Sequence, residues 1–382
     1  MPGLTDPAVA HATVARPTST AEVAEVMRDA AARGLSVVAQ GHGTKQGWGL
    51  PPTSMDLLLD LSGLDRVLDH QAGDLVVEVQ AGAPLAGVQE AVGSAGQRLA
   101  LDETLPGATV GGTLATNAAG PSRMLTGTAR DLLIGVTVVR ADGVVAKAGG
   151  RVVKNVAGYD LGKLVVASFG TLAVVTEAYF RLHPLPEVRR WVTVDAGTPL
   201  RAHELTHAVV HSQAVPWAVE LDGRTVSVLL GGRADGVDAR VRAVRGLLGG
   251  DEAAVTEAAP AGWGRYPWTP GETGLKVTFA LSGLHDVLVV ADEVGARVRG
   301  SAGVGVVHAA VADPAAVPDA LARLRAVAAR HGGTVVVVEA PPEVQQAVDV
   351  WGPVPGLDLM RRVKDQFDPD HRLAPGRFVG GI

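Results

Sequence analysis

A glycine-rich loop near the N-terminus limits the folds open to this chain more than any other feature. The loop spans Gln40–Gly49 and follows a predicted buried strand at residues 35–39. Gly41-His42-Gly43 directly after a strand is typical of a Rossmann dinucleotide site, and Asp60 lies about twenty residues further on, where a ribose-binding acid is expected. The first hypothesis is therefore a Rossmann fold.

Two features of the loop argue against that fold. The third glycine is Gly47, one place later than the motif requires, and no helical pattern follows it. Pro51 and Pro52 cannot belong to the helix whose N-terminal dipole would face a pyrophosphate. A Rossmann site is therefore not the favoured interpretation.

A second segment of small residues, Leu105–Gly120, suggests another way to bind a diphosphate. Successive backbone N–H groups in a glycine-rich turn form a nest for anions, because no side chain keeps the phosphate oxygens away. Residues 40–47 and 106–113 offer two such rows, about 65 residues apart. They predict one large diphosphate ligand bound by both loops, and the alternative is a pair of tight structural turns.

Length and composition set further limits. The chain has 382 residues, which favours two domains over a single core. Its formal net charge of −6 gives no indication of a nucleic-acid partner. It contains no cysteine, so it cannot hold an iron–sulfur cluster, a disulfide or a cysteinyl flavin link. No secretory signal or membrane span is recognisable, and a cytoplasmic protein is expected.

The pattern of predicted elements indicates an α+β protein with two domains and a returning C-terminal segment. The run His183-Pro184-Leu185-Pro186 marks the boundary between a first domain, residues 1–185, and a second domain, residues 186–340. In the second domain the order strand, helix, strand, strand, helix, strand recurs, which predicts a ferredoxin-like antiparallel sheet covered by helices on one face. Residues 341–382 are expected to pack back on the first domain.

Four segments of the first half, and one at the C-terminus, resemble a known family. They are Gln40–Gln46, Pro106–Asn117, Val153–Leu161, Ser168–Glu177 and the closing run Phe367–Phe378. Through them the first domain resembles the FAD-binding domain of the vanillyl-alcohol oxidase and p-cresol methylhydroxylase (PCMH) superfamily. Within it, the chain is most similar to the small flavin-binding subunits of glycolate oxidases. The resemblance implies a two-part PCMH-type FAD-binding domain with an α+β cap.

The resemblance also implies which residues bind the cofactor. Residues 41–45 would wrap the FAD pyrophosphate, the segments around Gly112 and Asn117 would line the pyrophosphate and the isoalloxazine, and residues 170–175 would lie along the ribose and adenine. Small residues and free N–H groups would thus face the phosphates. The full predicted set is Gln40, Gly41, His42, Gly43, Thr44, Lys45, Pro106, Gly107, Ala108, Thr109, Gly111, Gly112, Thr116, Asn117, Ala118, Gly170, Thr171 and Val175.

The first loop departs from the members of the family that attach their flavin covalently. Those members often carry a histidine directly after the last loop glycine. This chain has Thr44 at that place, and His42 precedes Gly43. Non-covalent FAD is therefore predicted, and His42 either faces the phosphates or packs outward.

Three residues are candidates for catalysis, each with a structural alternative. Hydroxy-acid dehydrogenases of the superfamily carry a histidine-rich strand with the sequence Gly-Asp-Gly-Asn in the cap domain. In this chain only His308 remains of that strand's histidines, and it is either a catalytic base or a core residue. Lys154 would place a positive charge near the flavin pyrimidine or lie at the surface. Arg377 would meet a phosphate or carboxylate, or form a structural ion pair.

The sequence also contains a literal HExxH motif, His203–His207. On a helix, two histidines and a glutamate at this spacing are typical of a zinc protease. One face of this helix, which includes Ala202 and Val209, is instead expected to be buried, and this places His203, His207 and His211 toward solvent. The residues of the buried face are Ala202, Leu205, Ala208, Val209 and Ser212. No metal site is predicted, and adventitious metal binding at the surface is the alternative.

These features together predict an FAD-dependent oxidoreductase subunit of glycolate-oxidase type. It would oxidise a small 2-hydroxy acid such as glycolate or D-lactate by hydride transfer to the flavin. Because the chain has no cysteine, a larger flavoprotein subunit and an iron–sulfur subunit are expected as partners. The alternatives are a flavin-binding relay or structural subunit whose partner carries the substrate site, and a self-sufficient oxidase that uses dioxygen.

Overall fold

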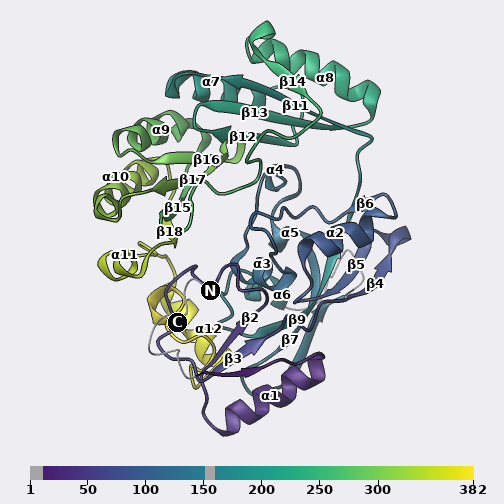
Figure 1. Ribbon diagram of the computed structural model, residues 1–382, viewed down its shortest axis with the longest axis vertical. Coiled ribbons are helices and arrows are strands. Elements are labelled where there is room, and N and C mark those ends of the chain that lie inside the picture. The colour runs from purple at the N-terminus through teal and green to yellow at the C-terminus, as the bar shows by residue number, and fades with distance from the viewer. Residues whose placement is uncertain (1–11, 151–159) are drawn as a thin grey trace. The chain divides into compact units, whose positions relative to one another are not determined.

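The computed structural model describes residues 12–150 and 160–382, which divide into two compact units (Figure 1). Of the described residues, the first unit comprises 12–119, 127–150, 160–185 and 353–382, and the second comprises 120–126 and 186–352. The short segment 120–126 lies inside the predicted first domain but is part of the second unit. Residues 341–352 of the predicted C-terminal segment are also part of the second unit.

Helix α1 (Thr20–Ala32) shows how local sequence specifies the first unit. The side chain of Ser19 accepts a hydrogen bond from the Glu22 N–H and so caps the helix. Gly34 follows the C-terminus at φ +67°, a left-handed conformation that glycine adopts without strain. The helix shares a hydrophobic cluster with a three-stranded parallel sheet of order β1-β3-β2, formed by β1 (Thr13–Ala15), β2 (Val37–Gln40) and β3 (Leu57–Asp60).

A five-stranded antiparallel sheet forms the other half of the first unit. Its central strands are buried on both faces, and Phe180 is among its fully buried side chains. The order is β4-β5-β9-β7-β8, with β4 (Val67–Gln71), β5 (Val76–Gln80), β7 (Leu133–Val139), β8 (Val145–Gly149) and β9 (Val174–Arg181). The remaining elements are α2 (Leu85–Gly93), β6 (Gln97–Arg98), α3 (Val110–Thr116), α5 (Ala129–Leu132), α6 (Leu161–Val165), β10 (His183–Pro184) and α12 (Leu357–Phe367).

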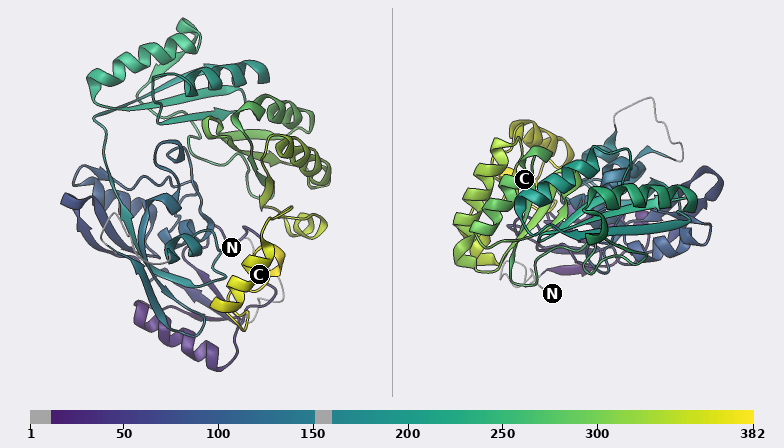
Figure 2. Two further views of the ribbon diagram at one scale, coloured as in Figure 1. Left: turned by 180° about the vertical axis from the view of Figure 1, so that it is seen from behind. Right: turned by 90° about the horizontal axis from the view of Figure 1, so that it is seen from above.

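The second unit contains two consecutive βαββαβ halves in one eight-stranded antiparallel sheet. The sheet order is β14-β11-β13-β12-β16-β17-β15-β18, so that each half has the strand order of a ferredoxin-like fold and the halves join through β12 and β16. Figure 2 shows the long helices of this unit on one face of the sheet. The elements are β11 (Val188–Asp195), α7 (Pro199–Val210), β12 (Ala218–Asp222), β13 (Thr225–Gly232), α8 (Ala234–Leu247), β14 (Ala254–Thr256), β15 (Thr273–Thr278), α9 (Leu284–Glu293), β16 (Arg297–Ser301), β17 (Val306–Val311), α10 (Val317–Arg330), β18 (Val335–Glu339) and α11 (Pro342–Ala347), with α4 (Arg123–Thr126) added from residues 120–126.

The C-terminal segment returns to the first unit, beside strand β2. The Val37 N–H donates to the Arg372 carbonyl at 2.8 Å, and the Ala374 N–H donates to the Val37 carbonyl at 2.9 Å. Leu373 thereby extends the parallel sheet as a bridge partner of Val37. Among the helices described, none combines the length and the hydropathy that crossing a membrane requires.

Candidate functional site

The two glycine-rich segments lie against each other in the first unit. His42 Nδ1 is 3.0 Å from the carbonyl oxygen of Gly107. A Cβ atom on Gly41 would collide with the side chain of Thr109, so only glycine permits this approach. Segments 65 residues apart in sequence therefore form one structure.

The first segment has the free backbone donors that an anion nest requires. Within the described residues, no hydrogen bond occupies the backbone N–H groups of residues 41–45. Gly43 has φ +73°, which turns the chain so that consecutive N–H groups can converge. This part of the loop can donate several hydrogen bonds to one anion.

The second segment differs from the predicted nest, because it forms the capped helix α3. The Thr109 hydroxyl accepts from the Gly112 N–H at 3.3 Å, and the N–H groups of Val110 and Gly111 donate to the carbonyls of Ala83 and Ala81. These donors are not free for a phosphate. Gly111 instead permits close packing, since a Cβ there would lie 2.9 Å from that of Ala81.

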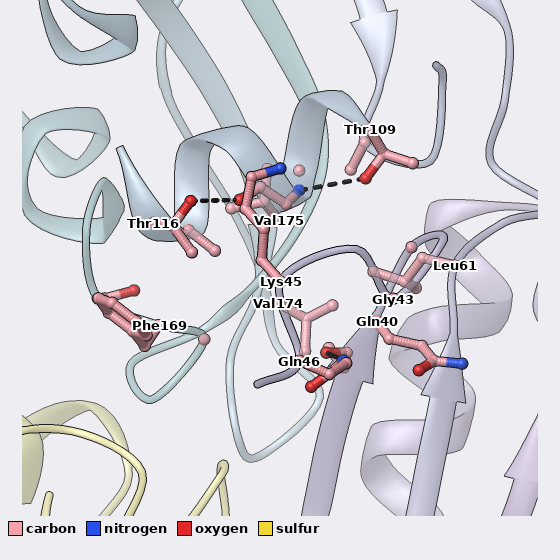
Figure 3. A pocket seen from close by; sticks show the side chains of 18 of the residues that line it. Gln40, Gly43, Lys45, Gln46, Leu61, Thr109, Thr116, Phe169, Val174 and Val175 are labelled. Carbon is pink, nitrogen blue, oxygen red and sulfur yellow. Dashed lines mark hydrogen bonds between the residues drawn. The ribbon is translucent and has the colours of Figure 1, made fainter. Parts of the chain in front are cut away.

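A pocket of about 770 Å³, open solvent included, lies between these segments and strand β9 (Figure 3). Figure 3 shows Thr109 and Thr116 on one wall, Phe169 on another, and Lys45 and Gln46 near the middle. The predicted residues that line the pocket are Gln40, Gly41, Gly43, Thr44, Lys45, Thr109, Gly111, Gly112, Thr116, Gly170, Val175 and Arg377.

Other predicted residues lie beside the pocket rather than on its wall. Ala108 and Thr171 are buried in the surrounding core at 1% exposure. Asn117 ends helix α3 in a left-handed conformation at φ +48°. The predicted residues outside the lining are His42, Pro106, Gly107, Ala108, Asn117, Ala118 and Thr171.

The pocket also contains residues that the sequence did not single out. Ala39 and Leu61 come from the ends of the parallel strands, and Phe169 comes from the run that resembles the family. The sequence could have indicated Ala39 and Leu61 through their positions at the ends of predicted strands next to the glycine loop, because strand ends at one edge of a sheet lie close together. The unpredicted lining residues are Ala39, Gln46, Leu61, Ala81, Ala115, Val165, Ser168, Phe169, Ala173 and Val174.

Two buried cations face this pocket, and no carboxylate is among its lining residues. Lys45 is 6% exposed, and burial lowers its pKa to about 8, opposed by the charge of Glu103. Arg377 is 5% exposed, donates to Gln46 Oε1 at 2.6 Å and to the carbonyls of Lys45 and Gln46, and has a buried Nε without a partner. Burial lowers the pKa of Arg377 to about 10. The pocket is thus suited to an anion.

His308 lies in a separate polar cluster, within the second unit. It is paired with Lys276 across strands β17 and β15 and is 8% exposed. The ring of Tyr266 lies 4.8 Å from that of His308 between centroids, and the ring of Trp268 lies 5.8 Å away. These aromatic rings enclose one side of the imidazole.

Burial and two neighbouring cations control the charge of this cluster. Burial, and then the charges of Arg123 and Lys276, hold the pKa of His308 well below its usual range, so the imidazole is neutral at physiological pH. Burial and Arg123 lower the pKa of Lys276 to about 8. The cluster therefore contains a neutral base beside a buried ammonium group, Lys276, whose charged form an anion would stabilise.

The remaining candidates lie elsewhere. Lys154 is outside the described residues. Helix α7, which contains the HExxH motif, buries Ala202, Thr206 and Val209. Leu205 and Ala208, which were expected to be buried, are only partly buried. His207 is exposed as predicted, but His203 is only partly exposed. In the described parts of the chain, no group of three acidic or histidine side chains could hold a metal ion.

The fold and the pocket together define an FAD-binding domain. Residues 11–149 match the family described as "FAD binding domain", and the cofactor of this domain is FAD. In structure, the chain is similar to alkyldihydroxyacetonephosphate synthase, with a TM-score of 0.71, 16% sequence identity, and coverage of 95% of this chain and 75% of that one. The two proteins therefore share a PCMH-type fold.

Comparison of sequences adds two relatives. Glycolate oxidase subunit GlcE of Escherichia coli (strain K12) is 37% identical over 169 residues, which cover 42% of this chain and 45% of the relative. D-lactate dehydrogenase of Archaeoglobus fulgidus is 34% identical over 221 residues, which cover 56% and 48%. The chain thus spans less than half the length of these curated relatives.

Proposed function

We propose that this chain is an FAD-dependent oxidoreductase subunit that oxidises a small 2-hydroxy acid. The proposal depends above all on one observation, the pocket in which free backbone donors and two buried cations meet without an opposing carboxylate. A diphosphate would satisfy all of these groups. When bound, FAD would supply the acceptor for a hydride from the substrate.

Each part of the pocket has a role in holding the cofactor. The N–H groups of residues 41–45 would donate to the pyrophosphate, and Lys45 would neutralise part of its charge. Arg377 braces the loop through the Lys45 and Gln46 carbonyls and would direct its free Nε toward an acceptor. Val174 and Val175 offer an apolar wall for a flat ring.

The cluster around His308 supports the substrate class. Lys276 and Arg123 would hold the carboxylate of a small acid, because burial and the charge of Arg123 disfavour the charged form of Lys276 and a carboxylate would relieve that cost. The neutral imidazole of His308 would accept the proton from the hydroxyl group at a ring nitrogen. The rings of Tyr266 and Trp268 would exclude water from that transfer.

Partners follow from the relatives and from the absence of cysteine. One relative is named as a subunit of glycolate oxidase. This chain has no cysteine to hold an iron–sulfur cluster that could pass electrons onward. We propose that it assembles with a larger flavoprotein subunit and with an iron–sulfur subunit, and that the complex is cytoplasmic.

Anaerobic bleaching of the flavin tests this function. The purified chain, loaded with FAD, is mixed with glycolate or D-lactate, and the visible absorption of oxidised flavin is recorded. Bleaching that is saturable and is weakened in Lys276→Met supports the proposal. A chain that binds no FAD contradicts it.

A second candidate function is a flavin-binding relay subunit without a substrate site. It is favoured by the single histidine of the cap strand, where the dehydrogenases of the superfamily carry several. Two results together would favour this function instead. The flavin of the isolated chain would stay unbleached, and activity would appear only after the partner subunits are added. That activity would be the same in the Lys276→Met variant.

A further inference from the structure

Helix α12 contains a completely buried lysine. Lys364 and Asp368 each have 0% exposed side-chain area, and Lys364 Nζ donates to Asp368 Oδ2 at 2.7 Å. The same ammonium group donates to the carbonyls of Thr171 at 2.8 Å and Leu373 at 3.0 Å. All three of its hydrogen-bond donors are therefore used, which a buried ammonium group needs.

One of these acceptors, the Thr171 carbonyl, lies directly beside a wall of the cofactor pocket. Thr171 follows directly on Ser168, Phe169 and Gly170, which line the pocket. The Thr171 hydroxyl donates to the Ser168 carbonyl at 2.7 Å, and the Thr171 N–H donates to the same oxygen at 3.0 Å. A displacement of Thr171 would therefore move the pocket wall with it.

The wall has a backbone conformation that its own residues do not favour. Ala167 has φ +64° and Phe169 has φ +54°, both in the left-handed region where side chains with a Cβ are disfavoured. Such a conformation persists only when the surrounding structure fixes it. The wall consequently depends on contacts from outside the loop.

Two kinds of contact fix the wall. On one side, the N–H groups of Ala167 and Phe169 donate to the carbonyls of Leu114 and Ala115 in helix α3. On the other side, the C-terminal segment contributes the bond from Lys364 and the ring of Phe378, which stacks on Phe169 with 5.4 Å between centroids. The C-terminal segment thus supports one face of the loop.

We propose that Lys364 is a positioning residue for the cofactor: by holding Thr171, it fixes the adjoining pocket wall at residues 168–170 without touching the ligand. Asp368 keeps the ammonium group charged and also accepts from the Leu373 N–H at 2.7 Å, which ties the same cation to the returning segment. The inference rests on the proposed cofactor pocket. The C-terminal segment would then contribute to FAD affinity as well as to the stability of the fold.

The test separates affinity from stability by means of two variants of the full-length chain. Lys364→Met removes the donor but leaves Asp368 buried without its cation, which lowers stability. Lys364→Met/Asp368→Asn removes both charges and keeps an acceptor for the Leu373 N–H. Arg362→Met is the matched control, because Arg362 is an exposed cation on the same helix.

We expect the double variant to recover thermal stability relative to Lys364→Met but not FAD affinity. At a temperature well below unfolding, its Kd for FAD, measured by quenching of flavin fluorescence, should rise about tenfold or more, since a hydrogen bond to a charged group is worth at least that factor. The visible spectrum of its bound flavin should lose fine structure. Arg362→Met should match the wild type in both measurements.

A folded double variant with the Kd and flavin spectrum of the wild type would overturn the inference and leave Lys364 a purely structural residue. Gly41→Val, which must displace Thr109, reports on the pocket itself. If Gly41→Val also binds FAD normally, the proposed pocket is wrong. If Gly41→Val binds weakly while the double variant binds normally, only the role of Lys364 is wrong.

Discussion

At the scale of single residues, the pocket is defined by two buried cations, Lys45 and Arg377, that face no carboxylate among its described lining residues. Lys45 is the clearest case: its ammonium group is buried, and it donates a hydrogen bond to the neighbouring Thr44 hydroxyl at 3.4 Å. A buried cation without a carboxylate is costly, and the cost falls when an anion binds beside it. The sequence indicated Lys45 through its place in the glycine loop, but its burial could only come from the fold.

The lowered pKa of Lys45 predicts that FAD affinity decreases in alkaline solution. Without FAD, burial lowers this pKa to about 8, whereas a bound diphosphate would raise it, so that binding takes up a proton above pH 8. Affinity is therefore greatest below pH 8, and the Kd should rise by at most about tenfold for each further pH unit. Fluorescence titration with FAD at several pH values measures this. Lys45→Met should bind more weakly at neutral pH and lose the pH dependence; an unaltered dependence in that variant would exclude Lys45 as its source.

His308 should act as a base over an unusually wide acidic range. Because burial and the charges of Arg123 and Lys276 depress its pKa well below 6.5, the imidazole stays neutral as the pH falls through that value. At saturating substrate, the anaerobic rate of flavin bleaching should thus show no loss at pH 6.5. His308→Asn should lower this rate by about a hundredfold or more, the usual contribution of a general base. A wild-type rate in a folded His308→Asn variant would assign His308 to the core.

At the scale of elements, the sequence predicted the elements with strong patterns and missed those that depend on partners. Strand β16 (Arg297–Ser301) has only a weak pattern of its own, since its alternating arginines carry no apolar signal. Its pairing with β17 and β12 supplies the stabilisation that its own composition lacks. Helix α3 was missed because two glycines lower its intrinsic helix propensity, and the Thr109 cap together with packing on Ala81 compensates.

The close approach of the two glycine segments predicts a contrast between two Gly→Ala substitutions. In Gly41→Ala the added methyl group meets Thr109, so the loop must move and FAD affinity should fall about tenfold or more. In Gly87→Ala, on the exposed side of α2, the methyl group meets nothing within 4 Å, and the helix should gain about 0.5–1 kcal/mol of stability. FAD titration and thermal unfolding of both variants provide the comparison. Equal FAD affinities in the two would show that the loops need not touch to bind the cofactor.

At the scale of the whole molecule, the sequence indicated two domains but not how the chain is shared between them. The break near Pro186 is local and therefore visible in the sequence. Residues 120–126 belong to the second unit because helix α4 contacts strand β12. These two elements are far apart in the sequence, so no local sequence pattern reveals their contact. The repeat of βαββαβ was visible as an order of elements, whereas its fusion into a single eight-stranded sheet depends on the pairing of β12 with β16.

The composition of the pocket predicts that FAD is held without a covalent bond in the complete protein. Covalent attachment needs a nucleophilic side chain such as histidine, cysteine or tyrosine, and the described residues lining the pocket include none of these. His42, the histidine of the loop, contacts the Gly107 carbonyl instead. Acid precipitation of the FAD-loaded chain should therefore leave the flavin in the supernatant and a colourless pellet, because unfolding destroys a pocket that would hold FAD by non-covalent contacts alone. A yellow pellet that keeps its flavin after washing in denaturant would show a covalent link and would require an attachment site outside this lining.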